Sequence, residues 1–144
     1  MPLLNYTTSI DALKSAGEIE YTLIKHGATA IMKNISAGRI ESMSFKIPTA
    51  SGEMPIRMPI NAAPVLQILK NQKRTNSKVQ ATPEQAERVA WRILKDWVEA
   101  QMAILETEMV KLEQIFLPYI VSNTGQTLYE ILEERQFLLG SGSH

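Results

Sequence analysis

The chain has 144 residues, of which 44% are apolar and 21% charged, with 15 basic and 15 acidic residues. This composition is typical of one folded domain and disfavours a disordered chain. The absence of cysteine excludes disulfides, thiolate metal sites and thiol catalysis. No apolar run approaches the roughly 18 residues of a membrane span, and the first residues lack the features of a secretory signal. We therefore expect a protein of the bacterial cytoplasm that has no contact with a membrane.

The order of patterns predicts an α+β fold in a single domain over residues 1–139. A sheet part, about residues 1–60, precedes a helical part, about residues 61–139. The last five residues, 140–144 (GSGSH), resemble a linker and the start of a histidine tag.

The first predicted helix covers residues 16–26. Ser15 and Glu18 have the spacing of a capping box, and Gly27 supplies a left-handed stop. His26 lies at the end of this helix, where a cation meets the negative end of the dipole, so we expect it to be structural or simply exposed, and not a catalytic or metal-binding residue.

A sheet of three to four antiparallel strands is predicted, with strands over residues 29–35, 40–47 and 54–58. Residues 6–13 could add a strand at the edge or form an extended arm. The strand over 40–47 alternates between apolar and polar residues, which indicates a half-buried strand. Pro55 and Pro59 confine the third strand to an edge of the sheet, because neither can donate a backbone hydrogen bond.

The helical part begins with Asn61, which we expect to cap a short helix over 62–72. An exposed polar loop follows at 71–82. Thr82 and Pro83 then open a long helix, in which Thr82 and Gln85 repeat the capping-box spacing. No glycine or proline follows before Pro118. A helix of that length exceeds the diameter of a compact domain, so it must either kink or protrude.

The apolar residues of this long helix recur with a spacing near 3.5. Such a stripe can pack against a copy of itself, so a homodimer through this helix is expected. Thr127 and Glu130 form another capping box, which starts a last helix over about 128–138. We expect this helix to fold back on the long one as a helical hairpin.

Motifs of catalysis are absent. There is no glycine-rich phosphate loop, no nucleophile elbow and no HExxH helix. Glu99, Glu106 and Glu113 fall seven residues apart, which fits a solvated acidic face better than a metal site. We therefore expect no enzyme, no metal and no cofactor.

Charge is unevenly divided along the chain. Residues 1–80 contain ten Lys/Arg and five Asp/Glu, whereas residues 81–144 contain five and ten. The basic half suggests an anionic partner, although attraction between the two halves explains the asymmetry equally well. The residues that we predict to bind phosphates are Arg39, Lys46, Arg57, Lys70, Lys73, Arg74, Lys78, Arg88, Arg92 and Lys95.

Aromatic residues beside these cations could stack on nucleic-acid bases. Arg88, Arg92 and Lys95 line one face of the long helix and Trp91 is adjacent, while Phe45 and Tyr6 accompany the sheet. The competing interpretation is that the aromatic residues belong to the core and the cations only solubilise the surface.

The segment 89–102 (VAWRILKDWVEAQM), followed by 116–119 (FLPY), resembles a group of small uncharacterised proteins encoded by bacteriophages and prophages. The segments 25–28 and 52–59 resemble the same group. This resemblance implies a mobile-element protein but assigns no role to any residue.

Together these features predict a non-enzymatic phage-type protein that binds single-stranded nucleic acid in replication or recombination. The alternative is a protein- or ligand-binding inhibitor of a host defence system. A hydrolase that uses helix carboxylates and a metal is a third, weaker interpretation.

Overall fold

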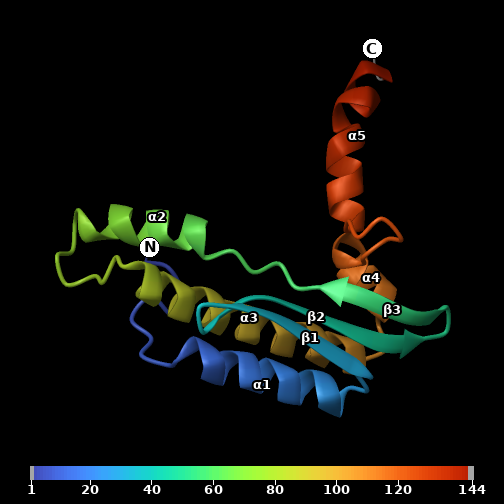
Figure 1. Cartoon of the computed structure of the whole chain (residues 1–144), viewed down its shortest axis with the longest axis horizontal. Helices are drawn as coiled ribbons and strands as arrows, with labels where there is room; N and C mark the ends of the chain where they lie inside the picture. The colour runs from blue at the N-terminus through green and yellow to red at the C-terminus, as the bar shows by residue number, and fades with distance from the viewer. Residues whose placement is uncertain (1, 143–144) are drawn as a thin grey trace.

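The computed structural model describes residues 2–142 of the chain, with side chains described as far as residue 135. Three antiparallel strands form one sheet in the order β1–β2–β3, and helices lie along one side of it (Figure 1). The strands are β1 (Ala30–Ser36), β2 (Arg39–Thr49) and β3 (Gly52–Arg57). The predicted α+β class, the order of elements and the three strands are thus confirmed.

The sheet is apolar on one face only. In β2, Met43, Phe45 and Ile47 are buried, while Ser44 and Lys46 between them are half-buried or exposed. This alternation follows from the two-residue period of a strand. The result is an inner face that forms the core and an outer face that stays open to solvent.

Two helices cover the inner face of the sheet. They are α1 (Ala12–Lys25) and α3 (Pro83–Glu106). Both contribute buried residues to a single core that also contains β2 and β3 residues. The first half of the apolar stripe of α3 is used inside the molecule, since Val89 is buried, but Ile104 and Met109 further along the chain are 39% and 70% exposed. The homodimer through this stripe stays a prediction.

The helix α1 begins four residues before the predicted start. Asp11 is its N-cap, and its side chain accepts a hydrogen bond from the Leu13 amide at 3.3 Å. Ser15 is fully buried instead, and its hydroxyl accepts a hydrogen bond from Arg92. The predicted cap at Ser15 was wrong because an aspartate one turn earlier competes for the same role.

A smaller second core lies under α2 (Ala62–Lys73), which packs on the first half of α3. Asn61 caps α2, as predicted, through a hydrogen bond from the Ala63 amide. Val79 in the following loop inserts into this core beside Leu69. The loop is therefore anchored at its centre.

The helix α3 is shorter than predicted. Thr107 ends it, and Glu108 adopts a left-handed backbone conformation with φ of 63°. The chain then forms α4 (Leu112–Phe116) and a 3-10 turn, η1 (Leu117–Tyr119). The long helix was predicted as far as Pro118 with either a kink or a protruding end, and the position of the break was missed because it occurs without a glycine or a proline.

The last helix, α5 (Leu128–Gly142), projects away from the body of the molecule (Figure 1). The predicted capping box is present, since Thr127 and Glu130 each accept a hydrogen bond from the amide of the other. The expected hairpin with the long helix is not formed, because α5 contacts η1 instead. The end of the expected tag, residues 143–144, lies outside the described residues.

Within residues 2–142, none of the helices combines the length and apolar character needed to cross a membrane.

Candidate nucleic-acid interface

Two of the three aromatic residues that we expected to stack on bases are in the core. Phe45 and Trp91 are each only 2% exposed. Phe45 faces inward from β2 and meets the edge of the Phe116 ring, with 5.7 Å between ring centroids. Neither residue offers a surface to a base, so the stacking predicted for both was wrong.

The basic stripe on α3 is largely engaged in ion pairs. Arg92 binds Glu18 of α1 as well as Ser15. Lys95 pairs with Glu99 one turn further along α3, with 2.7 Å between Nζ and Oε1. Arg92 joins α3 to α1, whereas the Lys95 pair lies within α3, and the charge of both cations is neutralised where phosphates would have to bind.

Two of the three cations predicted on the sheet are also engaged in ion pairs. Arg39 pairs with Glu87 of α3, and Arg57 pairs with Glu130 at 3.2 Å while it donates to the Gly125 carbonyl. Lys46 lies on the outer face of the sheet, where the described residues place no carboxylate within ion-pairing distance.

The remaining cations gather at one end of the molecule, which we call the basic end. It consists of the arm at residues 2–10, α2 and the loop at 74–82. The Leu3 amide ties the arm to α2 by donating to the Gln72 side chain at 2.8 Å. Its cations are Lys70, Lys73, Arg74 and Lys78, and the sequence of these three segments contains no aspartate or glutamate.

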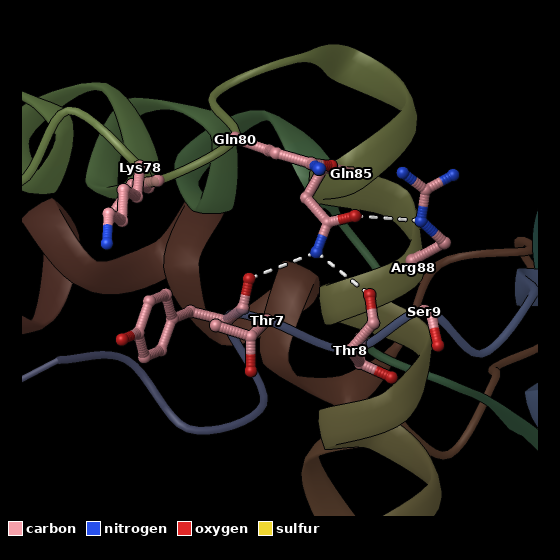
Figure 2. A pocket seen from close by; sticks show the side chains of 9 residues that line it. Thr7, Thr8, Ser9, Lys78, Gln80, Gln85 and Arg88 are labelled. Atoms are coloured by element: carbon pink, nitrogen blue, oxygen red, sulfur yellow. Dashed lines mark hydrogen bonds between the residues drawn. The ribbon is translucent and has the colours of Figure 1, made fainter.

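A cavity of about 320 Å³ opens between the arm and the start of α3. It brings together three of the residues predicted from sequence: Tyr6, Lys78 and Arg88. The arm contributes hydroxyl groups to its wall, and Lys78 and Arg88 lie towards opposite ends (Figure 2). A second hollow of about 300 Å³ shares Tyr6 and Val79 with the first.

Gln85 organises this cavity, a role beyond the capping box that was predicted for it. Its amide nitrogen donates to the Tyr6 and Thr8 carbonyls, each at 3.0 Å, and its oxygen accepts from Arg88 Nε at 2.8 Å (Figure 2). The side chain is 3% exposed. No local pattern could have indicated this, because the arm is more than 70 residues away in sequence.

Carboxylates and His26 do not assemble into a metal site. Among the described residues no group of three or more His, Asp or Glu is placed to hold an ion. His26 instead connects α1 to the end of α3, since its Nε2 lies 2.6 Å from Glu106 Oε1. Its other ring nitrogen lies 2.8 Å from the Thr22 carbonyl, within α1.

Comparisons of the chain with protein-family models, with curated proteins and with solved structures find no match.

Proposed function

We propose that this protein binds single-stranded nucleic acid, without catalysis, through the basic end. The supporting observation is the separation of charge in space. Four cations and no carboxylate come from the arm, α2 and the loop, whereas α5 on the other side of the molecule carries Glu130, Glu133 and Glu134 (Figure 1). The neutral net charge therefore conceals a surface suited to phosphates.

The size of the cavity favours a single strand over a duplex. A volume of about 320 Å³ lies at the lower end of the range for small-ligand sites, roughly 300 Å³ upwards. We propose that one unpaired nucleotide unit of a strand enters this cavity. Tyr6 is the one predicted stacking residue that borders it, and a half-buried tyrosine can offer its ring to a base.

The biological setting that we propose is phage replication or recombination. It rests on the resemblance of residues 89–102 and 116–119 to small phage proteins, and not on the geometry of the site.

Replacing Lys70, Lys73 and Arg74 together by alanine tests the proposal. All three are exposed at the end of α2, but Lys73 Nζ also donates to the Val79 carbonyl at 3.2 Å, so circular dichroism has to show that the triple variant keeps its fold. Each lost phosphate contact reduces the slope of log affinity against log salt by about 0.7 for a single strand. We expect this slope to become less steep by about 2, together with a large loss of affinity at low salt. Fluorescence anisotropy measures both.

A matched control replaces three exposed cations outside the basic end, Lys14, Lys111 and Arg135, by alanine. It changes the net charge equally. An equal loss of affinity in the two triple variants would show that binding depends on total charge alone, and the basic end would lose its proposed role.

The projecting α5 favours a second candidate function, binding to a host protein as an inhibitor. Tyr129 and Leu132 on α5 are 56% and 58% exposed, and Leu117 beside them is 52% exposed. An isolated helix of this length is marginally stable in water, and apolar residues on it are typical of a protein-binding face. Leu132→Glu should abolish binding to a host protein, while the basic-end triple variant should retain it.

A further inference from the structure

We infer that the Arg88 end of the cavity is a phosphate subsite and that Gln85 positions Arg88 to bind there. The inference rests on the proposed function and names the chemical group that this part of the interface takes, one phosphate of the strand. Lys78, at the other end of the cavity, would hold a neighbouring phosphate (Figure 2).

Of the three nitrogens of the Arg88 guanidinium, one is hydrogen-bonded and two are free among the described residues. Its Nε donates to Gln85 Oε1 at 2.8 Å. Among the described residues, no carboxylate pairs with its guanidinium and no hydrogen bond uses its two terminal nitrogens. By contrast Arg92, one turn further along α3, is occupied by Glu18. The terminal N–H groups of Arg88 thus remain available for the oxygens of a phosphate, which a planar guanidinium binds in pairs.

Gln85 can hold Arg88 because its own position is fixed. The buried amide group uses both of its ends: the nitrogen donates to the carbonyls of Tyr6 and Thr8, so the oxygen must face Arg88. A neutral amide suits this role better than a carboxylate, because it orients the guanidinium without neutralising its charge. Orientation before binding reduces the entropy lost when the ligand arrives.

The wall between the two cations is made of hydroxyl groups. Thr7, Thr8 and Ser9 of the arm all border the cavity, and Thr8 Oγ1 accepts a hydrogen bond from the Ile10 amide at 3.1 Å. A hydroxyl that accepts one hydrogen bond can still donate its proton. The wall therefore offers donors to phosphate oxygens and no negative charge that would repel them.

A double-mutant cycle on strand binding tests the inference. Arg88→Ala removes the phosphate contact and should weaken binding to a labelled single strand roughly tenfold, because a charge-assisted hydrogen-bonded pair is lost. Gln85→Met has nearly the same shape but cannot hydrogen-bond, and it should weaken binding by a similar factor. In the Arg88→Ala background, Gln85→Met should cause a clearly smaller loss than in the wild type, because the part that acts through Arg88 is already gone and only the loosened arm remains.

Circular dichroism and thermal unfolding show whether each variant is folded. If Gln85→Met loosens the arm too far to be used, Arg88→Lys replaces it in the comparison. Arg88→Lys keeps the charge but loses the planar guanidinium. It should therefore restore less than half of the binding free energy that is lost in Arg88→Ala.

The source of the phosphate is determined with strands that carry either a terminal phosphate or a terminal hydroxyl. If Arg88→Ala lowers the affinity for both strands by the same factor, the subsite binds an internal phosphate of the backbone. If the terminal phosphate raises the affinity of the wild type but not of Arg88→Ala, the subsite binds a strand end. Additive losses from the two substitutions, or full affinity in Arg88→Ala, would overturn the subsite. Loss of binding in the Lys70, Lys73 and Arg74 triple variant would then still support the proposed function. If the wild-type protein binds no strand, both proposals fail.

Discussion

For Phe45 the role predicted from the sequence differs from the position that the side chain has in the structure. It was a candidate for base stacking, but it lies in the centre of the core between the sheet and Phe116. We expect Phe45→Ala to lower the free energy of unfolding by about 3–5 kcal/mol, the usual cost of removing a buried aromatic ring. Chemical denaturation followed by circular dichroism provides the measurement.

Met32 on β1 is a suitable control, because it is 64% exposed on the same sheet. Met32→Ala should change the free energy of unfolding by no more than about 0.5 kcal/mol. A Phe45→Ala protein that keeps its stability but loses nucleic-acid binding would restore the stacking role.

Sequence reasoning contained the information needed to bury Phe45 and Trp91. Phe45 alternates in phase with Met43 and Ile47, and Trp91 is in helical phase with Leu94 and Val98, all of which are buried. In contrast, the role of Gln85 was inaccessible, because its partners Tyr6 and Thr8 are 79 and 77 residues away. Local periodicity predicts which face a residue occupies, but not which distant backbone groups it meets.

Among the elements, α5 depends on its first turn. The Thr127 amide and hydroxyl, followed by the charge of Arg57, lower the pKa of Glu130 below its ordinary value of 4.5. A carboxyl whose pKa is lower in the folded state stabilises that state above the ordinary pKa, and this contribution is lost as the pH falls through the lowered value. We therefore expect the first turn of α5 to lose protection below about pH 4.5.

Hydrogen exchange of the amides of residues 128–131, measured between pH 3 and pH 6 and corrected for intrinsic rates, reports this change. Glu130→Gln should show weaker protection at pH 6 and little further loss at low pH. An unchanged pH profile in Glu130→Gln would mean that the capping carboxylate does not stabilise this turn.

The break after α3 is a second property of an element, and Glu108 is its key residue. A side chain in the left-handed region costs about 1–2 kcal/mol in L-residues, and Glu108 has φ of 63°. Glu108→Gly should therefore stabilise the protein by up to about 1 kcal/mol, after the extra backbone entropy of glycine is subtracted.

Gln101→Gly inside α3 is the matched control, and it should destabilise by about 1 kcal/mol. Both free energies of unfolding come from urea titrations. A loss of stability in both variants would indicate that α3 continues through residue 108 in solution. The sequence could not predict this break, since the usual signals for a helix end are absent there.

At the scale of the whole molecule, the sequence correctly indicated a basic half and an acidic half. The fold then uses part of that charge internally, as in the pairs of Arg92 with Glu18 and Arg39 with Glu87. These partners are 74 and 48 residues apart in sequence, so no local pattern distinguished them from free cations. Among the described residues, the cations of the basic end, Lys70, Lys73, Arg74 and Lys78, are clustered and form no ion pair.

Fluorescence anisotropy with a labelled single strand of 30 nucleotides and the matching duplex, at low and at moderate salt, tests the central claim most directly. We predict that the protein binds the single strand more tightly than the duplex and that its affinity falls steeply as salt increases, because bound counterions are released from phosphates. Absence of binding to either probe at micromolar protein concentration would contradict the account and leave α5 as the surface to study.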